Sequence, residues 1–71
     1  MIPQTQLEVL KKLASLCELS PGVRIGQLTA HLGFLAEDMF DLGLGDIDDE
    51  QLLQVIERHE GELVSRQTNV A

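Results

Sequence analysis

The sequence has few aromatic residues and no apolar run of the length that a membrane requires. Tryptophan and tyrosine are absent, and Phe34 and Phe40 are the only aromatics among 71 residues. This composition favours stacked aliphatic helices over a sheet. The longest run of apolar residues and glycine, Leu32 to Ala36, is far shorter than the about 20 residues of a spanning helix. No basic region precedes an apolar stretch at the N-terminus. We therefore expect no signal peptide, no membrane partner and a cytoplasmic location.

Cysteine is nearly absent as well. Cys17 is the single cysteine, so no disulfide can form within one chain. A chain of this size buries only about 60% of the surface that its unfolded form exposes, and its stability is marginal without help. Association is one remedy, and we expect a homo-oligomer, most simply a homodimer. Cys17 lies among apolar residues with no base at helical neighbour spacing to form a thiolate, which predicts a core position.

Positive charge is scarce, and the negative charge is concentrated. Twelve acidic residues against five basic ones give a net charge of −7. The window 37–50 contains no base and seven acids: Glu37, Asp38, Asp41, Asp46, Asp48, Asp49 and Glu50. Such a window repels nucleic acid and attracts basic surfaces. Three helices in a chain of this length suggest helix-turn-helix DNA binders, but the charge has the wrong sign and no segment offers a basic recognition face. We expect no nucleic-acid partner.

Apolar residues recur with the spacing of a helix face in three segments. The first spans about 3–19 and stops at Ser20, Pro21 and Gly22, because proline cannot continue a helix. The second spans about 24–40 and the third about 48–66, and the sequence DLGLG (41–45) joins them. The tail 67–71 has nothing to hold it and is expected to fray. The sequence predicts one all-α domain over residues 1–71, a small three-helix bundle with short Pro/Gly turns.

The expected core positions follow the i, i+3, i+4 pattern in each segment. The first stripe is centred on Leu7, Leu10, Leu13, Ala14 and Cys17, and is widened by Val9 and Leu16. The second consists of Ile25, Leu28, Leu32, Leu35 and Met39, broadened by Ala36 and Phe40. The third consists of Leu52, Leu53, Val55, Ile56, His59, Leu63 and Val64.

The glycines carry two further predictions. Gly26, Ala30 and Gly33 fall on one stripe of the second segment, which predicts the close approach of another helix; alternatively, Gly33 breaks the helix in two. Either Gly43 or Gly45 is expected to take the left-handed conformation that ends this helix.

The stretch GDIDDEQLL (45–53) has three possible interpretations. As a calcium loop it fails, because Gln51 occupies the position of the required glycine and the helical pattern begins too early to wrap an ion. As a helix start it fits well. Asp48 and Gln51 have capping-box spacing, and Ile47 and Leu52 occupy the staple positions. Asp49 and Glu50 then meet the positive end of the helix dipole.

The third interpretation is a charged docking surface. Glu37, Asp38 and Asp41 lie in the last turn of the second segment. Carboxylates do not cap this end of a helix, and the helix dipole disfavours them there. Solubility alone would also account for such charge. If they act in docking, Leu42 and Leu44 are candidate apolar anchors, provided that they are exposed. The candidate partner-binding residues are Glu37, Asp38, Asp41, Leu42, Leu44, Asp46 and Asp49.

Candidates for chemistry are sparse. His31 and His59 lie on different segments and, with scattered acids, fall short of a zinc site. Arg24, Gln27 and His31 form a polar edge that we expect to face water, whereas His59 falls on the apolar side. No catalytic constellation or phosphate loop is evident. We therefore expect no enzyme activity, no cofactor and no metal.

Two resemblances bear on function. The stretch DLGLGDIDDEQLLQVIERHEG looks like the signature of acyl carrier proteins, but Asp46 stands where the cofactor-bearing serine would fall. The chain is also similar to a group of small bacterial helical proteins without an assigned activity, through an Arg-x-Gly-Gln-Leu stretch and an acidic run before a leucine-rich helix. The matching residues are Arg24, Gly26, Gln27, Leu28, Asp46, Ile47, Asp49, Glu50 and Leu52. This resemblance implies a helical fold and carries no function.

These observations support a non-enzymatic protein–protein interaction module that self-associates and docks its acidic window 37–50 on a basic partner, as an adaptor or inhibitor would. One alternative is a purely structural homo-oligomer whose acids serve solubility. Another is a carrier-like module without a prosthetic group.

Overall fold

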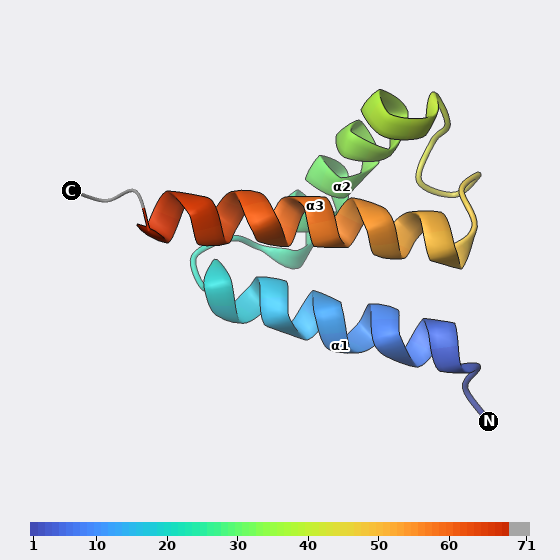
Figure 1. Ribbon diagram of the computed structural model, residues 1–71, viewed down its shortest axis with the longest axis horizontal. Helices are drawn as coiled ribbons and strands as arrows, with labels where there is room; N and C mark the ends of the chain where they lie inside the picture. The colour runs from blue at the N-terminus through green and yellow to red at the C-terminus, as the bar shows by residue number, and fades with distance from the viewer. Residues whose placement is uncertain (69–71) are drawn as a thin grey trace.

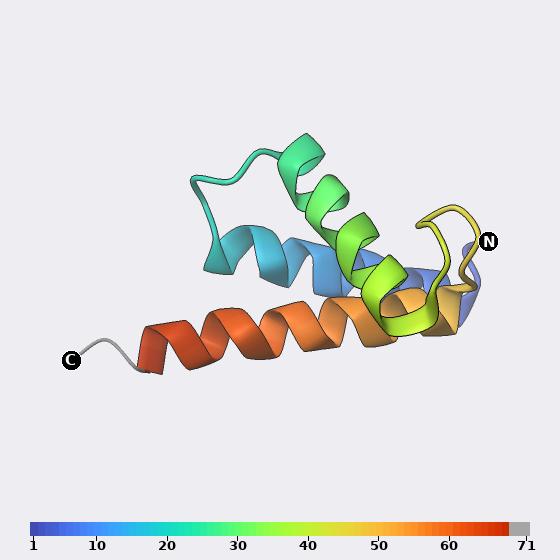
Figure 2. The same cartoon turned by 90° about the horizontal axis from the view of Figure 1, so that it is seen from above.

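The computed structural model describes residues 1–68 of the chain as three helices: α1 (Gln4–Leu19), α2 (Ile25–Phe40) and α3 (Asp49–Thr68). No strand occurs in this part of the chain, so the predicted all-α three-helix fold is confirmed. Helices α1 and α3 lie side by side and run in the same direction, while α2 crosses them obliquely on its return (Figures 1 and 2). None of the three helices combines the length and the apolarity that crossing a bilayer requires.

The first helix begins and ends without help from a side-chain cap. The Leu7 N–H donates to the Pro3 carbonyl at 3.0 Å, and α1 starts at Gln4. The helix therefore begins directly after the proline, in agreement with the predicted span of about 3–19. At the other end, the Ser20 N–H donates to the Leu16 carbonyl at 3.0 Å just before Pro21 stops the helix.

The start of α3 is the capping box that the sequence predicts. The Gln51 N–H donates to Asp48 Oδ1 at 2.7 Å, and the Asp48 N–H donates to Gln51 Oε1 at 3.0 Å. Ile47 and Leu52 are half-buried against the core, as a hydrophobic staple requires. The helix continues through Gly61 to Thr68, two residues beyond the expected limit of 66. The remaining part of the tail that we expect to fray, 69–71, lies outside the described residues.

The second helix is continuous through Gly33 and ends at Asp41 rather than at a glycine. Asp41 has φ 58° and ψ 32°, and its N–H donates to the Glu37 carbonyl. Within residues 1–68 no glycine has a positive φ, so the prediction that Gly43 or Gly45 would end α2 is wrong. Aspartate tolerates the left-handed region because its short polar side chain hydrogen-bonds locally. The Gly43 carbonyl instead accepts the Asp46 N–H at 2.9 Å in the turn that follows.

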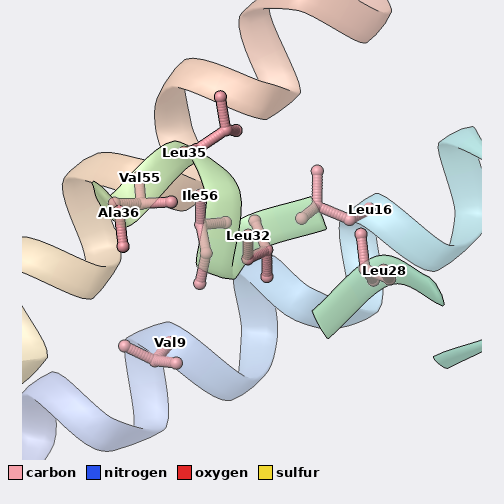
Figure 3. Packing of buried hydrophobic residues seen from close by; sticks show 8 residues of the cluster. All are labelled: Val9, Leu16, Leu28, Leu32, Leu35, Ala36, Val55 and Ile56. Atoms are coloured by element: carbon pink, nitrogen blue, oxygen red, sulfur yellow. The ribbon is translucent and has the colours of Figure 1, made fainter. Parts of the chain in front are cut away.

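The buried core draws on all three helices (Figure 3). Its members are Val9 and Leu16 of α1, Leu28, Leu32, Leu35 and Ala36 of α2, and Val55 and Ile56 of α3. The predicted stripes of α2 and α3 are confirmed except at Ile25 and Val64, which are 61% and 45% exposed. In α1 the centre of the stripe is displaced, because Val9 and Leu16 are buried whereas Leu10 is 52% exposed and Ala14 is exposed. Helix α1 packs mainly on α3 and scarcely on α2, so only one narrow face of it is covered.

Among residues 1–68, no other helix packs on the stripe of small residues of α2. Gly26 and Ala30 are exposed, and no atom lies within 4 Å of a Cβ built on Gly26. A Cβ on Gly33 would lie 3.9 Å from the Cβ of Leu44. The loop therefore covers Gly33, and the prediction of helix-on-helix packing at this stripe is wrong for the described fold.

Candidate functional site

The acidic window 37–50 occupies the end of the molecule where α2 passes into α3 (Figure 1). Glu37 and Asp38 belong to the last turn of α2, Asp41 ends it, Asp46 lies in the loop, and Asp49 begins α3. All five carboxylates are exposed. Folding thus leaves the predicted acids at one end of the molecule and in contact with solvent.

The two leucines of this window have different environments. Leu42 is 41% exposed, whereas Leu44 is half-buried and packs against the core. The condition set for an apolar anchor, exposure to solvent, is therefore met by Leu42 and not by Leu44. Leu44 instead holds the loop against α2 beside Gly33.

Two of the acids have partners on other helices. Arg58 Nη1 of α3 donates to Asp38 Oδ2 at 3.0 Å, and Gln6 Nε2 of α1 donates to Asp49 Oδ2 at 3.3 Å. The Asp38 side chain is still 66% exposed, so solvent screens this pair and its contribution to stability is small. Within residues 1–68, neither Glu37 nor Asp41 forms an ion pair.

An exposed aromatic ring accompanies these acids on α2. Phe34 is 70% exposed, although α2 buries four of its neighbours on the opposite face. Glu37, Asp38 and Asp41 follow Phe34 at i+3, i+4 and i+7, the spacings that share a helix face. We call Phe34, Glu37, Asp38 and Asp41 the acidic face of α2. Sequence reasoning missed Phe34, although its position off the 3,4-spaced seam was a signal of exposure.

A second cluster forms where α2 crosses α3. The ring centroids of His31 and His59 are 4.5 Å apart with the planes tilted by 56°. Glu62 lies one helical turn beyond His59, and its Oε2 is 3.8 Å from His59 Nδ1. His59 is 7% exposed, as its position on the apolar side predicts. His31 is half-buried rather than turned to water, because the crossing of α2 over α3 places it against His59.

The nitrogens of this pair are not satisfied within the fold. Among the described residues, neither His31 Nε2 nor His59 Nδ1 has a hydrogen-bond partner, and both are buried. The 3.8 Å contact with Glu62 is too long for a hydrogen bond. An unsatisfied buried polar group costs about 1–3 kcal/mol. Both nitrogens are therefore available to a further hydrogen-bonding partner or to a cation.

Burial and charge act on His59 in opposite directions. Desolvation lowers the pKa of His59 below its ordinary value of 6.5, and neighbouring His31 and Arg66 lower it further. The Glu62 carboxylate opposes this by favouring the protonated ring. The net lowering of the pKa leaves the His59 imidazole neutral near pH 7, the form that ligates metals.

A shallow cleft of about 230 Å³ opens beside the pair. Its walls include Val23, Leu28 and Leu63, with Gln27 and Arg66 as further polar members. Gln27 also caps α2, since the Arg24 N–H donates to Gln27 Oε1 at 3.1 Å. The polar edge predicted for Arg24, Gln27 and His31 is thus divided between a helix cap and the histidine cluster.

Cys17 is half-buried and packs against the core, as its sequence position predicts.

No protein-family model, curated protein or solved structure matches the chain.

Proposed function

We propose that the protein is a non-enzymatic, cytoplasmic interaction module that binds a basic protein surface through the acidic face of α2. The observation that carries this proposal is the position of Phe34, 70% exposed on the same helix face as Glu37, Asp38 and Asp41. An aromatic ring held in solvent gains free energy only when a partner covers it. The carboxylates around it specify that this partner is positively charged.

The two components of this face would act differently. Aromatic side chains near the centre of an interface often supply much of the binding free energy. Peripheral charges mainly accelerate association and select the partner, and their effect falls with salt. Asp38 is held by Arg58 at 3.0 Å, which reduces its freedom before a partner arrives. Leu42, 41% exposed just beyond the helix end, extends the apolar contact.

Self-association remains the second candidate, on a different surface. A symmetric dimer through the acidic face of α2 would bring like charges together. Leu10 and Ile25 are 52% and 61% exposed and lie outside the acidic window. They favour a homodimer that leaves the acidic face of α2 free for its partner. Light scattering after gel filtration measures this directly: twice the 7.8 kDa chain mass is expected, and a monomer at micromolar concentration would exclude the dimer.

The docking proposal is tested by capture from lysate with matched charge variants. The test variant carries Glu37→Gln, Asp38→Asn and Asp41→Asn, and the control carries Glu8→Gln, Glu18→Gln and Glu57→Gln. Each variant removes three exposed carboxylates and has the same net charge, −7 + 3 = −4. A basic protein should be captured by the native chain and the control at about 50 mM salt, and released at about 500 mM.

The same protein should be lost from the acidic-face variant and from Phe34→Ala. Equal loss from both charge variants would mean that net charge alone attracts it, and the proposed face would be wrong. Circular dichroism spectra of all the variants should be unchanged, because none of the altered side chains is buried.

A further inference from the structure

We propose that His31, His59 and Glu62 form a binding site for a divalent transition metal, with zinc as the best match. One ligand atom from each residue lies within 4.8 Å of the other two. Two of the ligands, His59 and Glu62, come from one turn of α3, and His31 comes from α2 across the helix crossing. A bound ion would therefore join the two helices.

The unpartnered nitrogens are the independent observation that points to a ligand. His59 is more than nine-tenths buried, and its Nδ1 has no hydrogen-bond partner among the described residues. His31 is half-buried, and its buried Nε2 atom likewise has no hydrogen-bond partner there. A neutral imidazole always presents one nitrogen lone pair. A cation between the two rings would be bound by both lone pairs and by a carboxylate oxygen, whereas the described residues supply neither nitrogen with a hydrogen bond.

The donor set selects the class of metal. Two imidazoles and one carboxylate are a ligand set that zinc uses, with a fourth position left for water. Calcium and magnesium prefer oxygen ligands alone. Zinc–ligand bonds of about 2.0–2.1 Å in a tetrahedron bring ligand atoms to about 3.4 Å from one another. The half-exposed side chain of Glu62 can rotate toward an ion, and the cleft beside the histidines leaves room for the fourth ligand.

Arg58 supports the orientation of Glu62 toward the histidines. Arg58 Nε lies 3.4 Å from Glu62 Oε1, while Glu62 Oε2 faces His59 Nδ1. The same guanidinium donates to Asp38. One carboxylate oxygen is thus held by an arginine and the other is available to an ion. Such outer contacts commonly orient metal ligands.

The test is a titration of the tag-free chain with Zn²⁺ and Co²⁺ in excess Mg²⁺, because Mg²⁺ occupies weak carboxylate sites. Calorimetry should give one Zn²⁺ per chain. Bound Co²⁺ should develop visible absorption bands without a thiolate charge-transfer band, since Cys17 is not a ligand. His31→Gln, His59→Gln and Glu62→Gln should each weaken Zn²⁺ binding by at least about tenfold.

The matched control is Asp46→Asn with Asp49→Asn, which removes two exposed carboxylates from the acidic window and should leave Zn²⁺ affinity unchanged. His59 is buried, so the half-buried His31→Gln and Glu62→Gln test the site even if His59→Gln fails to fold. Absence of stoichiometric Zn²⁺ binding would overturn the proposal. Binding that survives His31→Gln, or that is lost in the control, would overturn it equally.

Discussion

Asp41 has a left-handed backbone conformation, which glycine adopts more readily than aspartate does. Asp41 ends α2 with φ 58°, and its carboxylate stands at the negative end of the helix dipole. Both features oppose stability, and both are compatible with a carboxylate that serves a partner rather than the fold. His59 also carries a feature that opposes stability, because its buried Nδ1 has no hydrogen-bond partner within the described residues.

We expect Asp41→Gly to raise the free energy of unfolding by up to about 1 kcal/mol, since glycine enters the left-handed region without a Cβ clash. Asp41→Asn is the matched control, because asparagine keeps the left-handed tolerance and removes only the charge. Urea denaturation measures both variants. A decrease in stability for Asp41→Gly would show that the carboxylate itself holds the end of α2.

The lowered pKa of His59 predicts a pH dependence of stability in the metal-free chain. Because the folded pKa lies below the ordinary value of 6.5, the unfolded chain takes up the proton first as the pH falls. The contribution of neutral His59 to the stability of the folded chain is fully present above pH 6.5. It is lost as the pH drops from there toward the folded pKa. The groups facing this ring are His31 of α2 and Glu62 and Arg66 of α3.

Denaturation in EDTA at a series of pH values should therefore show stability decreasing below pH 6.5. The decrease should be smaller in His59→Gln, because this variant lacks the imidazole whose pKa burial lowers. An equal slope in the two proteins, or a steeper one in the variant, would contradict the inferred direction of the pKa shift.

At the scale of elements, the sequence predicted the three helices because their signals are local. Spacing of apolar residues, Pro21 and the Asp48–Gln51 box all act within a few positions. The displaced stripe of α1 could not be predicted, because it depends on which neighbour covers the helix. The same holds for Gly33, which faces Leu44 of the loop instead of a helix.

The candidate sites likewise combine features that the sequence predicts with features that depend on how the helices pack. The acids of the window 37–50 were evident from composition, and their exposure followed from their charge. Predicting that Phe34 is exposed required knowing which face of α2 is buried. Predicting the cluster of His31, His59 and Glu62 required knowing that α2 crosses α3. Helical spacing relates His59 only to Glu62 and not to His31.

Gly61 gives a prediction at this scale. It lies inside the continuous α3, and no atom is within 4 Å of a Cβ built on it. Gly61→Ala should therefore raise the free energy of unfolding by about 0.5–1 kcal/mol. The converse control, Ala14→Gly in an exposed position of α1, should lower it by a similar amount. A destabilising Gly61→Ala would indicate that α3 is not helical at this position in solution.

At the scale of the whole molecule, α2 has a separate role on each of its two faces. One face supplies half of the buried core and carries His31 to the cluster with His59 and Glu62. The other exposes Phe34 among carboxylates. Within residues 1–68, Arg58 links the histidine cluster to the acidic face of α2, because it contacts both Glu62 and Asp38. The fold therefore presents an acidic, aromatic surface on a helix that a metal would hold in place.

The most direct measurement of the docking claim places a photo-crosslinking amino acid, p-benzoylphenylalanine, at position 34 in the cells that produce the protein. A crosslink to a basic protein is expected. It should be lost when Glu37→Gln, Asp38→Asn and Asp41→Asn are added and retained with Glu8→Gln, Glu18→Gln and Glu57→Gln. No crosslink at position 34, or a crosslink only to a second copy of the chain, would contradict the docking claim.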